Sequence, residues 1–507
     1  MIHIIGGGLA GSEAAWQAAS MGVPVTVYEM RPVRPTAVHK TDRLAELVCS
    51  NSFRGDKLDN AVGLLKEEMR RLDSIVMRVA DRVRVPAGAA LAVDRERFAE
   101  GMTDAIAQHP LIRVERRELS QIPLPDEMSP VIVATGPLTS DALSADIARF
   151  VGRAHLAFFD AISPIVLAES IDMTKVFRQS RWDRSLTSQR ATETARQPTI
   201  LSPSGADASS LAVIGAQSAA AGTGPIDRPQ SPSLTNTGVD VSGDYLNCPF
   251  TADEYGAFHA AVVSAEKAVV HDFDNTKFFE GCLPIEVMAH RGTDTLRFGP
   301  MKPAGLRDPR TGRRPYAVVQ LRQDNLAGEH YSLVGFQTQI KWTEQTRVLR
   351  MIPGLERAEF VRLGMIHRNT YINGPTVLTE TWQTRTRPDL FFAGQVSGVE
   401  GYVESAASGL LAGRNAARRV LGLAPLAMPR TTAMGALAYY VSHADPAHYD
   451  PTNITFGILP PLDAPPKSKQ ERGLAVSARA LEALDRWTAT AGVFEIDRPI
   501  DFLIDRC

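Results

Sequence analysis

Small residues near the start of the chain have the types and spacing of a nucleotide-phosphate site. They are Gly6, Gly7, Gly8, Leu9, Ala10 and Gly11. Glycine lets the backbone turn sharply at Gly6, approach a pyrophosphate at Gly8 and pack a helix against a strand at Gly11. A helix that begins there points free N–H groups at the phosphates, and the Glu29 carboxylate suits the ribose hydroxyls. The pattern predicts an adenine-dinucleotide site, with a chance glycine-rich turn in a plain βαβ unit as the alternative.

Cysteine side chains offer a second kind of chemistry, nucleophilic addition by a thiolate. Cys282 directly precedes a helix predicted over 284–290, where unpaired N–H groups and the helix dipole favour an ionised thiol. Cys248 also precedes a proline and a helix, so the pattern alone hardly separates it from Cys282. Cys49 lies in a polar turn close in sequence to the predicted nucleotide site. An inert buried thiol is the commoner role for any single cysteine, so all three stay open on pattern alone.

A second glycine junction lies late in the chain. Asp389 precedes the apolar run 390–393, which stops at Gly394 and Gln395, and a helix rich in small residues begins near Tyr402. Such a helix can approach a cofactor closely, and its N-terminus offers another anion site. Two nucleotide-facing ends so far apart in sequence favour FAD over NAD as the resident cofactor.

Cations gather in one segment, 291–322. They are Arg291, Arg297, Lys302, Arg307, Arg310, Arg313, Arg314 and Arg322, against only Asp294 and Asp308. Lysine and arginine contact nucleic-acid phosphates, which position the partner without reading its sequence. This segment is the preferred candidate for an RNA contact, with a plain solvated charged face as the alternative.

Strands and helices must hold these groups in place. The order strand, glycine turn, helix and strand over 1–29 predicts the first βαβ unit of a parallel sheet, and the apolar run 131–136 predicts another buried parallel strand. Apolar residues three and four apart from Val62 to Val79 predict one long helix. Thr251 and Glu254 have the spacing of a capping box at a further helix start.

Overall composition sets wide bounds. A chain of 507 residues with a formal net charge of −2 suggests two to four domains and no nucleic-acid partner readable from charge alone. Four cysteines predict reduced thiols and a cytoplasmic location, and no run of spanning length predicts a membrane helix. No metal site is predicted. Residues 185–242 are rich in Ser, Thr, Ala, Pro and Gly and hold no aromatic residue, so we expect a disordered, dispensable insertion.

Several stretches resemble one family over nearly the whole chain outside 185–242. They are GGGLAGSEAAWQAA, ELVCSNSFRGD, EGCLPIEVMA, GPMKPAGL and FFAGQVSGVEGYVESAASG. These stretches are long and unusual in composition. The chain resembles the bacterial folate-dependent tRNA (uracil-5-)-methyltransferases, flavoproteins related to the enzymes that build carboxymethylaminomethyl groups on wobble uridines.

The resemblance implies an activity: methylation at C5 of uridine 54 in the T loop of tRNA. It implies 5,10-methylenetetrahydrofolate as the one-carbon donor and FAD, recharged by NAD(P)H, as the reductant, without S-adenosylmethionine. Cys282 and Cys49 would be the active-site thiols. We expect Cys282 to attack uracil C6 and Cys49 to take the C5 proton, and the reverse assignment stays open.

The folate pterin needs an aromatic partner. Tyr402 is the first candidate for stacking near the flavin ring and Tyr371 the second, with a packing tyrosine as the alternative for each. Lys302 would lie beside the flavin. We also expect the target base to be flipped out of its loop.

The expected fold is a doubly wound, Rossmann-like α/β FAD-binding fold of the two-dinucleotide-domain type with an inserted α/β domain. The predicted parts are 1–137 and 316–425 for the FAD-binding domain, 138–315 for the insertion domain and 426–507 for a partly helical C-terminal segment. The task of that segment and the oligomeric state stay open. Rival functions are the same chemistry on a ribosomal RNA uridine, a small-molecule FAD oxidoreductase and a non-catalytic RNA-binding flavoprotein.

Overall fold

The computed structural model describes residues 1–36, 38–152, 156–161, 163–183, 243–268 and 283–490. Its central feature is a five-stranded sheet in the order β16–β7–β1–β2–β6, in which every neighbouring pair is parallel. The strands are β1 (Ile2–Ile5), β2 (Val25–Glu29), β6 (Ile112–Arg116), β7 (Val131–Val133) and β16 (Leu390–Phe392). Strand β1 has neighbours on both sides, and the chain leaves it at the glycine turn. Ligands of open parallel sheets bind at the carboxyl ends of such strands.

Helices pack around this sheet and come from both ends of the chain. They are α1 (Leu9–Ser20), α2 (Ala61–Arg71), α3 (Ile75–Arg82), α4 (Arg95–Gln108), α5 (Asp141–Val151), α11 (Gly374–Val377), α12 (Tyr402–Val420), α13 (Ala433–His443) and α14 (Lys469–Thr490). Helices α1 and α12 cross in close contact, because a Cβ on Gly409 would lie 2.2 Å from the Ala10 carbonyl oxygen. The first and last thirds of the chain therefore share one core.

The predicted long helix from Val62 to Val79 is two helices, α2 and α3. The chain turns between them at Asp73, which has a φ of 59°. Ser74 caps α3 by accepting from Met77 N–H, and the buried Glu13 carboxylate accepts from Ser74 O–H and Val76 N–H. The apolar spacing runs through the break because both helices face the same core.

A second, antiparallel sheet organises the inserted part of the chain in the order β10–β11–β12–β13–β9–β14. Its strands are β9 (Ile165–Leu167), β10 (Phe177–Arg178), β11 (Tyr245–Phe250), β12 (Ala317–Gln323), β13 (His330–Leu333) and β14 (Phe360–Arg362). Helices α7 (Ala252–Ser264), α8 (Ile285–His290), α9 (Thr295–Phe298) and α10 (Trp342–Leu349) accompany it. The antiparallel sheet thus extends past the predicted boundary at 315, and the chain rejoins the parallel sheet only at β16.

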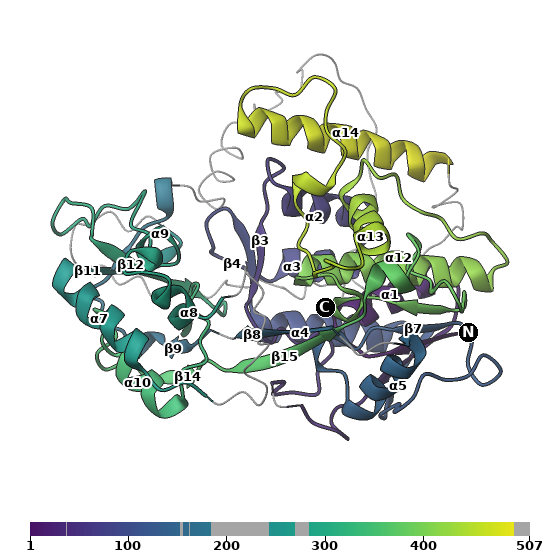
Figure 1. The fold of residues 1–507 in the computed structure, drawn as a ribbon, viewed down its shortest axis with the longest axis horizontal. Coiled ribbons are helices and arrows are strands. Elements are labelled where there is room, and N and C mark those ends of the chain that lie inside the picture. The colour runs from purple at the N-terminus through teal and green to yellow at the C-terminus, as the bar shows by residue number, and fades with distance from the viewer. Residues whose placement is uncertain (37, 153–155, 162, 184–242, 269–282, 491–507) are drawn as a thin grey trace, which may run out of the picture.

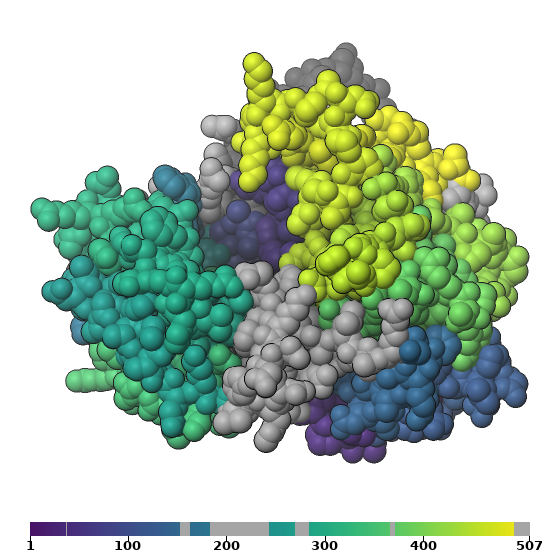
Figure 2. Space-filling view, in the orientation of Figure 1, coloured from purple at the N-terminus to yellow at the C-terminus, as the bar shows by residue number. Residues whose placement is uncertain are grey.

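Two smaller sheets connect these parts. Strands β8 (Leu156–Ala161) and β15 (Ile366–Tyr371) form an antiparallel ladder that runs between the inserted unit and the parallel-sheet half (Figure 1). Strands β3 (Ser52–Gly55), β5 (Ala90–Val93) and β4 (Arg84–Val85) form a three-stranded sheet. Figure 2 shows a hollow between the inserted unit and the C-terminal segment, with residues of the N-terminal part at its floor.

Several sequence predictions are confirmed. The strand at 131–136 is β7, the capping box at Thr251 starts α7, and the helix predicted over 284–290 is α8. The predicted mixed α/β fold with a parallel sheet is present. The insertion at 185–242 lies outside the described residues. Among the described helices, none is both long and apolar enough to cross a membrane.

Candidate active site

A cavity of about 420 Å³ lies where the five parallel strands end. Its walls include the segments that directly follow the carboxyl ends of β1, β2, β6, β7 and β16, which is where open parallel sheets bind nucleotides. Other walls come from the Cys49 turn and from residues 332–337 of the inserted unit. The cavity therefore lies between the nucleotide-binding half and the antiparallel sheet.

The glycine turn after β1 has the geometry that its sequence predicts. Gly6 has a φ of 103°, and a Cβ on Gly11 would lie 1.9 Å from the Gly6 carbonyl oxygen. A Cβ on Gly8 would meet nothing within 4 Å, so this backbone faces the open cavity. Gly8 is the N-cap of α1 and no side chain caps it, which leaves N–H groups of the first turn for a ligand.

Glu29 lies against this turn as an ionised carboxylate. It accepts from Gly7 N–H at 3.0 Å and from the Arg31 N–H and Nε at 3.0 and 2.9 Å. These contacts with Arg31 and Gly7 outweigh the effect of burial and hold the pKa of Glu29 below its usual value. A carboxylate can accept about four hydrogen bonds, so one place remains for a ribose hydroxyl.

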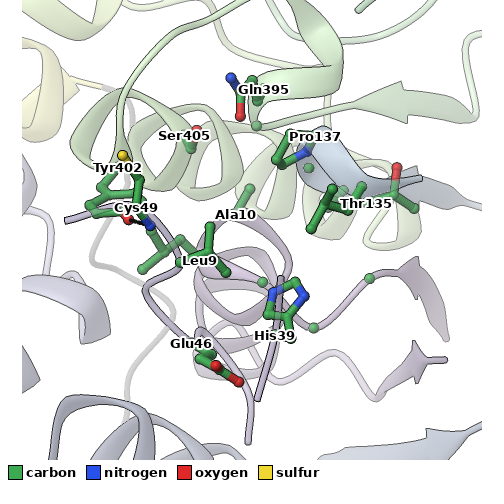
Figure 3. A pocket seen from close by; sticks show the side chains of 18 of the residues that line it. Leu9, Ala10, His39, Glu46, Cys49, Thr135, Pro137, Gln395, Tyr402 and Ser405 are labelled. Atoms are coloured by element: carbon green, nitrogen blue, oxygen red, sulfur yellow. Dashed lines mark hydrogen bonds between the residues drawn. The ribbon is translucent and has the colours of Figure 1, made fainter. Parts of the chain in front are cut away.

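His39 lines the cavity near Glu29 and is uncharged at neutral pH. Burial, with the charge of Arg31 as a second cause, lowers the pKa of His39 to about 4. Arg31 also pairs with Glu46 at 3.3 Å, which ties the loop that holds Glu46 to this end of the cavity. In Figure 3, His39 and Glu46 lie together, apart from Cys49 and Tyr402.

The second glycine junction completes the opposite wall. Gly394 has a φ of 76°, and a Cβ there would lie 2.9 Å from the Ala10 side chain on α1. Its N–H donates to the Ser408 hydroxyl of α12 at 2.7 Å, and Gln395 donates to Glu400 at 2.6 Å. The two predicted nucleotide-facing loops therefore touch each other.

The C-terminal segment supports this junction. Asn453 lines the cavity and donates through its amide to the Glu400 carbonyl at 2.6 Å. The Tyr449 hydroxyl donates to the Gly398 carbonyl at 3.1 Å, and Ile454 N–H donates to the Glu404 carboxylate at 2.8 Å. Part of the segment after 426 thus belongs to the cavity wall.

Tyr402 positions the Cys49 turn (Figure 3). Its hydroxyl oxygen accepts from Cys49 N–H at 2.8 Å and from Ser50 N–H at 3.1 Å. Burial, followed by the neighbouring Cys49, raises the pKa of Tyr402 well above its usual value, so the phenol stays neutral. The ring is held against Phe53 with centroids 5.8 Å apart. The two hydrogen bonds to the Tyr402 hydroxyl hold Cys49 on the cavity wall.

Three arginines from distant segments surround the Cys49 turn. Arg95 and Arg362 donate to the Cys49 carbonyl at 3.4 and 3.2 Å, and Arg322 donates to the hydroxyl of the following serine at 2.8 Å. Asp324 pairs only with Arg95 among them, at 2.8 Å. Burial, with the charge of Arg95 next, lowers the pKa of Arg362 to about 10. Reactive cysteines are found in such electropositive surroundings.

A comparison with family models matches residues 1–202 and 225–424 to the family described as glucose inhibited division protein A. Among curated proteins, one from Symbiobacterium thermophilum is 54% identical over 96% of each chain, and its name is methylenetetrahydrofolate--tRNA-(uracil-5-)-methyltransferase TrmFO. A protein of the same name from Enterococcus faecalis is 50% identical, covering 95% of this chain and 97% of its own. The chain belongs to the TrmFO family.

A solved structure supports the fold assignment for this TrmFO family member. Aquifex aeolicus GidA superimposes with a TM-score of 0.64 at 17% identity, covering 97% of this chain and 74% of its own. At that identity the likeness establishes the fold alone. Residues 203–224, which the family model leaves unmatched between its two matched parts, fall inside the predicted insertion.

The cavity brings together most of the site residues predicted for this TrmFO family member. Lining it are Gly6, Gly7, Gly8, Leu9, Ala10, Glu29, Cys49, Gly394, Gln395 and Tyr402. Gly11 lies behind the turn, where it lets α1 approach β1. Cys282 lies outside the described residues.

Other candidates lie away from the cavity. Tyr371 is buried against Tyr449, and Cys248 is buried in β11, where burial raises the pKa of its thiol far above the usual value. Lys302 is exposed and does not line the cavity. Of the basic segment, only Arg322 lines the cavity.

Sequence reasoning missed several residues in or beside the cavity of this TrmFO family member. Arg95 and Arg362 carry no local pattern, and they meet Cys49 only through the fold. His39 and Asn453 likewise lie in loops without a motif. The family stretch around Arg95, PAGAALAVDRE, is the one signal that points to it.

Proposed function

We propose that this chain methylates C5 of uridine 54 in the T loop of tRNA, with 5,10-methylenetetrahydrofolate as the one-carbon donor and reduced FAD, recharged by NAD(P)H, as the reductant. Relatives at least 50% identical over nearly their whole length are named as folate-dependent tRNA uracil-5-methyltransferases. The observation that carries the proposal is that Cys49 lines the same cavity as the glycine turn and Glu29.

The residues present fit FAD. The α1 N-terminus and Gly8 would face its phosphates, Glu29 has one acceptor place for a ribose hydroxyl, and the Gly394–Gln395 junction would hold the flavin end. When bound and reduced, FAD supplies the hydride equivalent that turns a transferred methylene into a methyl group. Every other step falls to the side chains of this protein.

Uracil C5 is a poor nucleophile, and a thiolate that adds to C6 makes C5 reactive. A second group must then remove the C5 proton after the one-carbon unit has joined C5, and tetrahydrofolate departs as the leaving group. When the methylene has been reduced to methyl, the C6–S bond breaks and returns the thiolate. We assign the addition to Cys282 and the proton removal to Cys49, and we keep the reverse assignment as the other outcome of the test. The described chain resumes at Leu283, and Ile285 N–H donates to the carbonyl of Gln337, which lines the cavity.

The residues around Cys49 have different roles. Tyr402 holds the turn through two backbone N–H groups, and its ring offers an apolar face for a flat pterin. Arg95 and Arg362 fix the Cys49 carbonyl, so the thiol keeps its place while substrates bind and leave.

A tRNA that carries 5-fluorouridine at position 54 tests this proposal. Fluorine cannot leave as a proton does, so a thiol that has added to C6 stays covalently attached. We expect a protein–RNA adduct, in the presence of the folate donor, that digestion and mass spectrometry locate on Cys282, or on Cys49 under the reverse assignment. An RNA left without any adduct, or an adduct on Cys248, would contradict the proposal.

A further inference from the structure

One surface of the inserted unit combines exposed aromatic rings with cations. Trp182 is 65% exposed and Phe298 is 77% exposed, although large apolar side chains of this size are usually buried. Lys302 and Arg307 follow Phe298 in the chain and are also exposed. We call these four residues the aromatic–basic ledge.

The ledge is held together by backbone contacts. Trp182 N–H donates to the Gly305 carbonyl at 3.0 Å, and a Cβ on Gly305 would lie 2.8 Å from the Trp182 ring. The ring therefore rests on a glycine that has no side chain to cover it. Lys302 N–H donates to the Gly299 carbonyl at 3.2 Å, directly after Phe298. The turn 299–305 thus joins both aromatic residues.

The backbone of Trp182 has an unusual conformation. It has φ 59° and ψ 27°, a left-handed conformation that is uncommon for a bulky residue. Arg181 anchors the turn by donating to Gln320 at 2.7 Å and to the Ala304 carbonyl at 3.2 Å. These contacts hold the turn that carries the exposed indole.

Charge on the ledge is positive. In the described part of the chain, neither Lys302 nor Arg307 forms an ion pair, whereas Asp308 pairs with Arg310 at 2.8 Å. The nearby Asp294 pairs with Arg297 at 2.7 Å. Two cations beside two exposed rings therefore stay available to an anionic partner.

The ledge lies next to the candidate active site. A Cβ on Gly335, which lines the cavity, would lie 2.8 Å from Pro300 in the turn that joins the aromatic residues. Gln320, the partner of Arg181, accepts at its carbonyl from the N–H of Val334, another cavity residue. A nucleic acid on the ledge would therefore reach the cavity rim.

We propose that the aromatic–basic ledge binds unpaired nucleotides of the RNA substrate, with a base stacked on Trp182 and phosphates held by Lys302 and Arg307. Single-stranded RNA is recognised by aromatic stacking combined with cations along its backbone. An acidic protein would satisfy the cations but would leave the two flat rings without matching partners. The inference rests on the proposed RNA substrate, and it adds the surface of the protein on which that RNA would lie.

Binding of unmodified tRNA, followed by fluorescence anisotropy at fixed salt, tests the ledge. We expect Trp182→Ala to weaken binding about 10- to 100-fold, the size of one lost base stack, and Trp182→Phe to keep most of the affinity. Trp342→Ala is the matched control, because Trp342 is 60% exposed on α10, away from the ledge, and this variant should bind as the wild type does. Bound flavin and the melting temperature check that each variant is folded.

The salt dependence of tRNA binding provides the second part of this test. The double variant Lys302→Ala/Arg307→Ala should bind less tightly and with a salt slope lowered by about 2, because two phosphate contacts are lost. Equal affinities for the wild type and Trp182→Ala would overturn the ledge, and so would equal losses in Trp182→Ala and Trp342→Ala. Trp182-dependent binding without methylation would contradict the proposed function alone, whereas methylation with Trp182-independent binding would contradict the ledge alone.

Discussion

At the scale of single residues, the three-dimensional surroundings of Cys49, and not its sequence neighbours, distinguish it from Cys248. The Cys49 turn is bound by Tyr402 and by arginines at the cavity, whereas the Cys248 thiol is enclosed in the antiparallel sheet. The packing around a thiol decides whether a substrate can reach it. The two residues therefore form a matched pair for substitution.

Replacing Cys49 with alanine should abolish methylation and leave the cofactor bound. A thiol that takes part in the reaction cannot be replaced by a methyl group, and we expect a loss of about 10³-fold or more in kcat, in line with the removal of an essential catalytic group. Single-turnover formation of 5-methyluridine measures this. Cys248→Ala, the control, should keep activity within a few-fold, and similar losses in both variants would refute the assignment.

Lys66 gives a prediction about pH. Its ammonium is fully buried and donates to the Phe53 and Gly55 carbonyls at 3.0 and 2.5 Å, with Asp56 at 4.0 Å. Burial lowers the pKa of Lys66 from about 10.5 to about 7. Between these values the unfolded chain binds more protons than the native protein, so stability should rise as pH rises through this window.

Urea unfolding between pH 6.5 and 9 measures this effect on Lys66. The free energy of unfolding of the wild type should increase with pH relative to Lys66→Met, which lacks the titrating group. Parallel pH profiles for the two proteins would show that the lysine does not titrate in this range. Because the carbonyls that it binds flank Arg54 on the cavity wall, bound flavin should be followed in the same samples.

At the scale of elements, the crossing of α1 and α12 decides how the two nucleotide-facing loops meet. Gly409→Ala would place a Cβ 2.2 Å from a backbone oxygen of α1, so one helix must move. We expect a loss of about 1–3 kcal/mol in stability and weaker binding of FAD, since the first turn of α1 would shift. Thermal unfolding and flavin titration measure the two effects.

Gly256→Ala is the control for this substitution. Gly256 is also in a helix, α7, and a Cβ there meets nothing within 4 Å. It should be neutral or stabilising by up to about 1 kcal/mol, because alanine favours helices more than glycine does. A Gly409→Ala protein as stable as Gly256→Ala would contradict the close crossing.

Local patterns predicted the elements that depend on neighbouring residues. The glycine turn, the strand at 131–133 and the capping box at Thr251 follow from spacing within a few residues. The break at Asp73 was missed because both helices keep the same buried face. The basic segment included Arg322, but its meeting with Arg95 and Arg362 around Cys49 was missed because α4, β12 and β14 come together only in the folded chain.

At the scale of the whole molecule, the ends of the predicted insertion lie side by side. Asp244 N–H donates to the Ser180 hydroxyl at 3.0 Å, and a Cβ on Gly243 would lie 2.4 Å from the Gln179 backbone. Strands β10 and β11 pair directly across this junction. A short connection could therefore replace everything between 183 and 243.

Replacing residues 184–242 with a short glycine–serine linker should leave FAD binding and methylation within about two-fold of the wild type. The physical reason is that the composition of 185–242 offers too little apolar surface to form a core, and the paired strands already hold its ends. Flavin content and the rate of 5-methyluridine formation measure the outcome. Loss of either property would show that the segment contributes to the site.

The most direct test of the proposed function traces which donor supplies the methyl carbon of 5-methyluridine. The purified protein is given unmodified tRNA, NADPH and 5,10-methylenetetrahydrofolate labelled with carbon-13 at the methylene group, in parallel with labelled S-adenosylmethionine. Mass spectrometry of the T-loop nucleosides should find labelled 5-methyluridine at position 54 with the folate alone. Unlabelled position 54 with the folate donor, or label that arrives from S-adenosylmethionine, would contradict the account.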